Sequence, residues 1–445
     1  MVTEDSLEQV HQKFLNAKSA QGAWREVPLQ KKLQAVKKFS DLVEDRKEKL
    51  AKILTEEMGK PITQSRNELN GLKGRIDFFL ENTEKTLYPE TVFSEEKKLE
   101  EVITHEPLGV ISNISAWNYP YFVGSNVFIP ALLTGNTVLY KPSEFATLTG
   151  LAIADLLHEA GVPKDVFIPV VGAGKTGQYL LQQKLNGIFF TGSYATGKKI
   201  SEMAAPQLMK VQLELGGKDP VYVCEDVDVA SAAAGTADGA MYNTGQSCCS
   251  VERIYVQEKI YLKFLDAFVE TVKGFSMGDP MDEKTYIGRL TRGELQIEVL
   301  EKQVQDALSK GAKLLTGGKR AQRKGGAFFE PTVFSDVNHT MELMREESFG
   351  PIIGIQKVAS DEQALALMND TEYGLTASVY CKDPERARKI LEKVHAGSAY
   401  WNCCDRVSPR LPWSGRGHSG IGSTLSKLGI LTFTQPKAWH RRYPT

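Results

Sequence analysis

The chain has 445 residues, of which 42% are hydrophobic and 24% are charged, and its formal net charge is −1. These fractions are typical of a globular protein, and the length predicts two or three domains rather than one core. Acidic and basic residues are interspersed, which argues against a nucleic-acid partner or a role on a membrane surface.

Cysteine and histidine usage predicts neither disulfides nor a metal site. Six cysteines in a chain this long do not form a disulfide scaffold, and the two Cys-Cys pairs lack the spacing of a zinc site. The N-terminal stretch MVTEDSLEQV is acidic and polar, unlike a signal peptide, and no apolar run approaches the ~20 residues that span a bilayer. We therefore expect a cytoplasmic protein without a bound metal.

The first hundred residues are predicted to be helical, followed by a hairpin. The segment SLEQVHQKF already has a helical pattern, and apolar residues recur every three or four positions from Leu29 to Met58. Another helix is expected after Pro61. Residues 85–106 contain two short apolar runs around a charged stretch, with Pro89 near one end and Pro107 just after the other, which predicts a hairpin-like excursion.

From Gly109 onward the pattern alternates between short apolar runs and helical segments, which predicts parallel sheets covered by helices. The expected strands of the first sheet are 110–114, 137–140, 166–171 and 187–190. A second α/β region is expected after Gly217, with helices at 228–243, 260–274 and 294–310 and strands at 253–256, 352–356 and 377–380.

A glycine-rich stretch, Gly172–Gly177, matches G-x-G-x-x-G after an expected strand. The signal is weak because Glu202, about where a ribose-binding acid should lie, falls inside a helical pattern. A phosphate-binding G-x-x-x-x-G-K-[ST] loop is excluded because Pro169 stands in place of the first glycine. We interpret the stretch as a turn between a strand and a helix.

Three separate residues have the chemistry of a catalytic site. Cys248 lies on a small polar turn, and a free thiol with a pKa near ~8.5 needs activation to become a nucleophile. Glu214 lies in an apolar strand, where burial raises a carboxyl pKa toward the range of a general base. Asn118 follows the first sheet strand and can donate to an oxyanion. Taken singly, each also fits a structural role: Cys248 as a buried thiol, Glu214 as an ion-pair partner of Lys218, and Asn118 as a turn residue before Pro120.

Taken together, the motifs resemble the aldehyde dehydrogenase superfamily over almost the whole chain. The matching segments are EPLGV and WNYP (106–120), KPSE (141–144), FFTGS with Gly197, LELGGK (213–218), GQSC (245–248) and EESFGP (346–351), with PRLPWSG and SGIG (409–422) matching more loosely. Their order and spacing, including that between Glu214 and Cys248, make the resemblance specific.

The resemblance implies a catalytic role for each of the three residues. Cys248, rather than Cys249, aligns with the nucleophile, and Glu214 aligns with the general base. Asn118 and the Cys248 backbone N–H align with the oxyanion hole. Thiolate attack on an aldehyde would give a thiohemiacetal, hydride transfer would leave a thioester, and water activated by Glu214 would hydrolyse it.

The resemblance also implies an NAD(P)⁺ site. Lys141 and Glu144 align with residues that hold the adenosine ribose, Ser193 with the pyrophosphate contact, Glu347 with the nicotinamide ribose ligand, and Phe349 with a side chain near the nicotinamide. The other residues expected along this site are Trp117, Ser143, Gly192, Gly197 and Leu215. Because a carboxylate accepts from a ribose hydroxyl and repels a 2′-phosphate, Glu144 predicts a preference for NAD⁺. Lys141 and Ser143 leave NADP⁺ open.

The expected substrate is a medium-chain or aromatic aldehyde. The residues expected to line its funnel are Tyr121, Ser247, Cys249, Trp401 and Trp413, with the segment VERIYV near the nucleophile. One alternative is a semialdehyde of the succinate-semialdehyde type, with Arg406 or Arg410 holding the carboxylate. Another is acyl transfer to coenzyme A, which Glu214 disfavours because only the hydrolytic reaction needs activated water. A third is a non-enzymatic protein that keeps the fold, which the intact site residues disfavour.

The resemblance implies an α/β architecture with a Rossmann-type parallel-sheet cofactor domain, an α/β catalytic domain and a small β oligomerisation element. The expected domains are 1–84 with 107–216 for the cofactor, 217–425 for catalysis, and 85–106 with 426–445 for assembly as a homodimer or homotetramer. The chain departs from the family in two places. The strand pair usually found before the first helix is absent, and Ser423-Thr424 replace the usual Arg-Glu, so that hydrolysis would depend on Glu214 alone.

Overall fold

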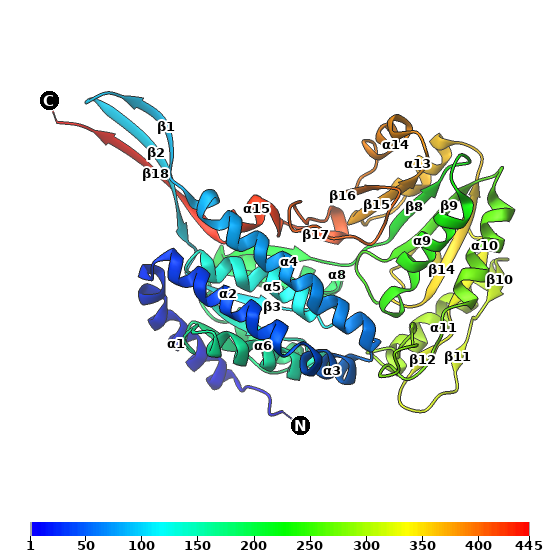
Figure 1. Cartoon of the computed structure of the whole chain (residues 1–445), viewed down its shortest axis with the longest axis horizontal. Helices are drawn as coiled ribbons and strands as arrows, with labels where there is room; N and C mark the ends of the chain where they lie inside the picture. The colour runs from blue at the N-terminus through cyan, green and yellow to red at the C-terminus, as the bar shows by residue number, and fades with distance from the viewer. Residues whose placement is uncertain (1, 445) are drawn as a thin grey trace.

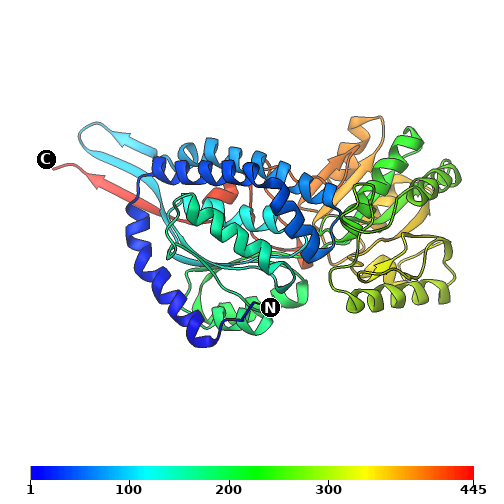
Figure 2. The same ribbon diagram turned by 60° about the horizontal axis from the view of Figure 1, so that its bottom comes forward.

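The computed structural model describes residues 2–444 and has two lobes joined side by side, with a narrow sheet extending from one of them (Figures 1 and 2). The α/β architecture expected from the sequence is confirmed. Of the helices formed by residues 2–444, none has the length and apolar character needed to cross a membrane. Within the same residues, no group of three or more His, Cys, Asp or Glu side chains is placed to hold a metal ion.

The chain begins with four helices that cover the first lobe. They are α1 (Leu7–Glu26), α2 (Leu29–Asp45), α3 (Lys47–Met58) and α4 (Ile62–Leu87). A capping box at Ser6 and Gln9 starts α1, and Gly59, with φ of 81°, ends α3. The continuous helical pattern predicted from Leu29 to Met58 is therefore two helices, which meet at Arg46.

The first lobe is built on a six-stranded sheet in the order β17-β7-β6-β3-β4-β5. Its strands are β3 (Val110–Ile114), β4 (Thr137–Lys141), β5 (Phe167–Pro169), β6 (Gly187–Thr191), β7 (Lys210–Glu214) and β17 (Gly420–Ile421), and only β17 runs antiparallel to its neighbour. The helices between them are α5 (Pro120–Leu133), α6 (Thr147–Glu159), α7 (Gly174–Leu181) and α8 (Tyr194–Ala204). Alternate strand residues enter two cores: Val138 packs with α2–α6, and Leu139 packs with α1 and α7.

The order of these strands predicts where a ligand binds. The chain runs outward from β3 through β4 to β5 and then returns to β6 on the other side of β3. In open α/β sheets, ligands bind beyond the carboxyl ends of the strands at such a switch point. The segments that follow β3 and β6 contain Asn118 and Ser193, so both lie at this switch point.

The second lobe has a seven-stranded sheet in the order β10-β13-β14-β9-β8-β15-β16, parallel except for β10. Its strands are β8 (Asp219–Val223), β9 (Val251–Gln257), β10 (Lys313–Thr316), β13 (Thr332–Ser335), β14 (Ile352–Val358), β15 (Thr376–Tyr380) and β16 (Ser398–Trp401), and β11 (Arg320–Ala321) pairs separately with β12 (Phe328–Phe329). Its helices are α9 (Val229–Met241), α10 (Tyr261–Lys273), α11 (Glu294–Ser309), α12 (Glu342–Arg345), α13 (Asp361–Asn369) and α14 (Pro384–Leu391).

A three-stranded antiparallel sheet projects from the first lobe and ends near the C-terminus of the chain (Figure 1). It contains β1 (Glu90–Glu95), β2 (Leu99–Pro107) and β18 (Thr434–Arg442), so the predicted excursion at 85–106 is confirmed as a hairpin. The boundary expected at 425/426 differs in detail. β17 pairs with β7, and α15 (Ser426–Leu431) packs on α4 and α5, so the chain returns to the first lobe before β18 begins.

Candidate active site

Two cavities meet at Cys248. The larger, of about 920 Å³, runs along the carboxyl ends of the first-lobe strands, and the smaller, of about 300 Å³, lies between α4, α5 and the second lobe. Cys248 and Thr191 line both cavities, whereas Asn118 lines only the larger and Glu214 only the smaller. The thiol of Cys248 is therefore accessible from both sides.

The turn that carries Cys248 is held in an uncommon backbone conformation. Asn243, Thr244 and Gly245 have φ values of 52°, 59° and 69°, a region in which residues other than glycine are strained. A Cβ atom on Gly245 would lie 2.2 Å from the Gly350 carbonyl oxygen, so this position requires glycine. The Asn243 side-chain amide donates to the Gln246 carbonyl (3.0 Å) and fastens the turn.

Asn118 is attached to the same turn. Its side chain is 4% exposed, and its Nδ2 donates to the Gln246 carbonyl at 3.2 Å. Its own backbone carbonyl accepts from Asn243 Nδ2 at 3.3 Å. Because an amide nitrogen carries two hydrogens, one N–H of Asn118 remains to donate to an oxyanion beside Cys248.

Glu214 ends β7 with a side chain that is buried and bonded to neutral groups. The residue is 5% exposed, and its carboxylate accepts from Gln212 Nε2 (3.2 Å) and from the Thr424 hydroxyl. Burial raises the pKa of the Glu214 carboxyl to about 7, against the effect of these two hydrogen bonds. The ion pair with Lys218 that was considered from the sequence is absent, because Lys218 binds Glu252 at 2.6 Å.

The larger cavity contains nine of the ten residues predicted to bind a cofactor: Trp117, Lys141, Ser143, Glu144, Gly192, Ser193, Leu215, Glu347 and Phe349. Gly197 does not line it. A Cβ atom on Gly197 would lie 2.6 Å from the Leu215 side chain, so this glycine instead lets α8 approach Leu215, the residue that follows β7.

The polar groups of the larger cavity suit an anionic dinucleotide. Ser193 caps α8 by accepting from the Thr196 backbone N–H, so the amino end of this helix opens on the cavity. Lys141 Nζ lies 4.0 Å from the Glu144 carboxylate, and burial lowers the pKa of Lys141. At the end nearer Cys248, Glu347 accepts from the Gly217 backbone N–H at 3.0 Å, and burial raises its pKa to about 8.

Two features in or next to the larger cavity were not expected. Gly174 and Gly177 line it where α7 begins, so the interpretation of Gly172–Gly177 as only a turn is incomplete. Glu252, in the segment VERIYV, does not reach the substrate side. It accepts from the backbone N–H groups of Ser348 (3.1 Å) and Phe349 (3.1 Å) and so supports the segment that carries Glu347.

The smaller cavity contains three of the five residues predicted to contact substrate. Ser247, Cys249 and Trp413 line it. The prediction for Tyr121 is wrong, because positions 119, 122, 123 and 126 of this segment face the cavity at helical spacing, whereas Tyr121 is fully buried in the core. The prediction for Trp401 is also wrong. Its side chain is 46% exposed, bonds the Cys381 carbonyl (2.9 Å) and lies outside the cavity.

The sequence interpretation missed several charged residues of the smaller cavity. Glu68 and Arg75 reach it from α4, and Asp405 reaches it from the segment after β16. Asp405 accepts from the Cys249 thiol (3.0 Å), and burial raises its pKa to about 7. Of the two arginines considered for a carboxylate, Arg406 lines the cavity and Arg410 does not.

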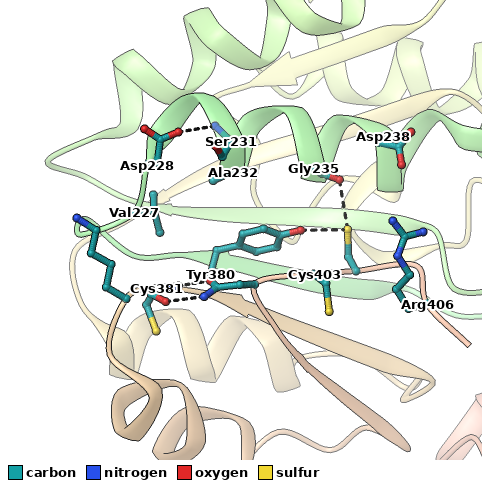
Figure 3. Close-up of a pocket in the computed structure, with 13 residues that line it drawn as sticks. Val227, Asp228, Ser231, Ala232, Gly235, Asp238, Tyr380, Cys381, Cys403 and Arg406 are labelled. Carbon is teal, nitrogen blue, oxygen red and sulfur yellow. Dashed lines mark hydrogen bonds between the residues drawn. The ribbon is translucent and has the colours of Figure 1, made fainter. Parts of the chain in front are cut away.

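A further cavity, of about 430 Å³, lies under α9 beside β15 (Figure 3). Tyr380 donates to Cys404 Sγ (3.5 Å) there, and Cys404 in turn donates to the Gly235 carbonyl (3.4 Å). Cys248, Glu214 and Asn118 do not line it. The three predicted catalytic residues therefore line the two other cavities, which meet at Cys248.

Comparison with known proteins agrees with this geometry. Residues 1–439 match the family described as "Aldehyde dehydrogenase family". The succinate-semialdehyde dehydrogenase [NADP(+)] of Deinococcus radiodurans is 34% identical over 96% of this chain and 89% of its own length. The betaine aldehyde dehydrogenase of Bacillus subtilis is 33% identical over 94% and 86%.

The fold also agrees with that of solved structures. The crystal structure of an NAD-dependent aldehyde dehydrogenase from Sinorhizobium meliloti superposes with a TM-score of 0.96 at 34% identity, over 99% of this chain and 88% of that one. With a thiol in the wall of two cavities, a buried carboxylate in the wall of one of them and a match over almost its full length, the chain belongs to the aldehyde dehydrogenase family, whose members oxidise aldehydes with NAD or NADP.

Proposed function

We propose that this enzyme oxidises an aldehyde to a carboxylic acid by the hydrolytic route, with Cys248 as nucleophile, Glu214 as general base and Asn118 as oxyanion donor. The observation that carries the proposal is the position of Cys248 in the wall of both cavities, with Glu214 in the smaller one. An aldehyde in the smaller cavity and a cofactor in the larger one would meet where Cys248 and Thr191 line both, and Cys248 is the nucleophile of that pair.

The first half of the reaction uses Cys248 and its hydrogen-bond donors. Deprotonated Sγ attacks the carbonyl carbon, so that a C–S bond forms as the C=O π bond breaks and negative charge develops on oxygen. The free Asn118 N–H and the Cys248 backbone N–H donate to that oxygen, and losing one such donor typically costs ~10²–10³ in rate. An oxidised nicotinamide bound in the larger cavity supplies the hydride acceptor. Loss of hydride from the tetrahedral carbon leaves a thioester on Cys248.

The second half uses Glu214. Its carboxylate takes a proton from a water molecule that attacks the thioester, and the C–S bond breaks to release the acid and restore Cys248. A pKa of about 7 suits this work, because the group is charged in part at neutral pH and still basic enough to accept a proton. Acyl transfer to coenzyme A, the runner-up, needs no such base.

We propose NAD⁺ as the preferred cofactor, with NADP⁺ use possible. Glu144 lines the larger cavity beside Lys141, and we assign this part of the cavity to the adenosine ribose. Its carboxylate would accept from a ribose hydroxyl and repel a 2′-phosphate. The ratio of kcat/KM for NAD⁺ to that for NADP⁺ should exceed one and should fall in Glu144→Gln. A wild-type preference for NADP⁺ would contradict the assignment.

The smaller cavity favours a compact or medium-chain aldehyde. Its volume of about 300 Å³ is at the low end for small-molecule sites, and its walls include the rings of Tyr119, Phe122 and Trp413.

The projecting three-stranded sheet supports assembly as a homodimer or homotetramer, because both of its edge strands, β1 and β18, are almost wholly exposed.

The test is a screen for reduced-cofactor formation over aliphatic, aromatic and carboxylated aldehydes, with and without coenzyme A. The expected product is the free acid in both conditions, and Cys248→Ser should abolish turnover. An acyl-coenzyme A product would favour the acylating route. An absence of turnover with every aldehyde, together with an unreactive Cys248, would contradict the proposal altogether.

A further inference from the structure

A buried arginine faces the smaller cavity without a partner. Arg75, on α4, is 6% exposed and lines the cavity that contains Glu214 and Cys249. In the part of the chain that the structure describes, its buried Nε has no hydrogen-bond partner. Glu68, the nearby carboxylate on the same helix, is bonded instead to Lys60 and to the Tyr121 backbone N–H (2.9 Å).

Aromatic stacking fixes the Arg75 side chain. The guanidinium carbon lies 3.7 Å from the centre of the Phe122 ring, and that ring stacks on Tyr119 at 5.9 Å with an interplanar angle of 3°. A Cβ atom on Gly71 would lie 2.7 Å from Phe122 Cζ, so glycine at this position makes room for the ring. Stacking on one face leaves the N–H groups at the edge of the guanidinium available to a ligand.

A second unpartnered polar group lies beside it. Asn126 is 4% exposed, lines the same cavity, and has a side-chain oxygen without a hydrogen-bond partner among residues 2–444. It is one helical turn after Phe122 on α5, and therefore on the same face as the ring that supports Arg75. Buried polar groups are normally hydrogen-bonded, so two such side chains in one cavity indicate a polar ligand.

The charge of the cavity indicates that this ligand is an anion. The carboxylate of Glu68 is neutralised by Lys60, and burial raises the pKa of both Glu214 and Asp405 to about 7. Burial lowers the pKa of Arg75 only to about 10, so the guanidinium remains charged at neutral pH. A carboxylate accepts two parallel hydrogen bonds from a guanidinium, which is the favoured pairing for this geometry.

We propose that Arg75 binds a carboxylate at the far end of the substrate, with the N–H groups of the Asn126 side-chain amide as further donors, so that the preferred substrates are short aliphatic aldehydes bearing a terminal carboxylate. The proposal rests on the oxidation proposed above. The carboxylate takes no part in the chemistry: the carbonyl carbon is oxidised at Cys248, and the product is a dicarboxylate.

The experiment compares matched aldehydes in the full-length enzyme with saturating cofactor. The substrates are 4-oxobutanoate, its neutral isostere 4-methylpentanal, in which an isopropyl group replaces the carboxylate, and cationic 4-aminobutanal. The wild-type ratio of kcat/KM for 4-oxobutanoate over 4-methylpentanal should be about 10²-fold in favour of the carboxylate, as expected for charge-assisted bonds in a buried site.

Variants assign the preference to Arg75. Arg75→Met should lower the ratio to near one, chiefly through KM for 4-oxobutanoate, and Arg75→Lys should retain part of it. Asn126→Leu should lower it by a smaller factor. Arg66 lies on the same helix and pairs with exposed Glu48 and Glu283, so Arg66→Met is the matched control and should leave the ratio unchanged.

The outcomes separate this inference from the proposed function. Oxidation of 4-methylpentanal or 4-aminobutanal in preference to 4-oxobutanoate by the wild type would overturn the role of Arg75 and leave the oxidation intact. An equal fall for all three aldehydes in Arg75→Met would also overturn it. Because Arg406 also lines the cavity, Arg406→Met is a second variant. Retention of the preference in Arg406→Met supports Arg75 as the carboxylate ligand, and its loss there with retention in Arg75→Met would overturn the inference. If no aldehyde is oxidised, the proposed function itself fails.

Discussion

The contact between Thr424 and Glu214 links a departure from the family pattern to the chemistry. Thr424 stands where the family often has glutamate, and its hydroxyl donates to the Glu214 carboxylate. A hydrogen bond to the charged form of an acid lowers its pKa. We therefore interpret Thr424 as a positioning residue that limits how far burial raises the pKa of Glu214.

Thr424→Val should raise the pKa of Glu214 by about one unit, since a hydrogen bond to a charged group contributes ~1.5–3 kcal/mol. Because the base must be ionised, the acidic limb of the pH profile of kcat should move upward. The loss of rate should be largest near pH 6 and small near pH 9. Ser423→Ala, one position before, is the control and should keep the wild-type profile.

Glu214→Gln should slow hydrolysis of the thioester more than the first hydride transfer. The amide keeps the size of the side chain and removes the base. Stopped-flow measurement should show a burst of reduced cofactor of near wild-type amplitude, followed by a steady-state rate ~10²–10⁴ lower. An equal loss in both phases would mean that Glu214 also acts before the thioester forms.

Residue types and spacing in the sequence pick out three candidate reactive groups that all line the two cavities, but they predict the other residues of the smaller cavity poorly. Cys248, Glu214 and Asn118 belong to short motifs that keep their order along the chain. Arg75 was missed because a charged residue in a helical pattern is usually on a solvated face. Tyr121 was misassigned because its helical phase relative to the cavity depends on packing that the sequence does not show.

At the scale of elements, the turn at 243–245 packs against the second lobe, and this packing sets the position of Cys248. Gly245→Ala should place a Cβ atom against the Gly350 carbonyl in a backbone region that disfavours alanine. The expected cost is ~1–3 kcal/mol of stability, and displacement of Cys248 should lower kcat/KM by ~10². Thermal unfolding and steady-state kinetics measure the two effects.

The matched control for this substitution is Gly74→Ala. Gly74 lies in α4 with no atom within 4 Å of an added Cβ, so alanine should stabilise the helix by about 0.5–1 kcal/mol. Wild-type kcat/KM in Gly245→Ala would show that the conformation of this turn does not position the thiol.

Helices and strands can be predicted from the sequence where the pattern of buried residues is regular. The parallel strands at 110–114 and 187–191 are buried at every position, and short, largely apolar runs mark them in the sequence. The break between α2 and α3 has no proline or glycine to mark it, and β17 has only two residues. Such features depend on tertiary contacts, as does the return of the chain to β7 before β18.

For the whole molecule, the projecting sheet predicts self-association. Multi-angle light scattering should give a mass of two or four times the 49.3 kDa of one chain. Val92 and Phe93 are exposed on β1, and Trp439 is exposed on β18. Val92→Glu with Phe93→Glu, or Trp439→Glu, should shift the enzyme toward smaller species.

Exposed residues far from the sheet supply the control. Leu262→Glu on α10 changes an apolar side chain on the second lobe that is more exposed than those on the sheet and should leave the assembly unchanged. A wild-type mass of 49.3 kDa at micromolar concentration would contradict the assignment of the sheet as an oligomerisation element.

The most direct test of the central claim is intact-protein and peptide mass spectrometry of Glu214→Gln after mixing with cofactor and aldehyde. The account predicts an acyl adduct that accumulates on the peptide containing Cys248-Cys249, is assigned by fragmentation to Cys248, and disappears in Cys248→Ser. An adduct on Cys249, or turnover in Cys248→Ser, would contradict the account.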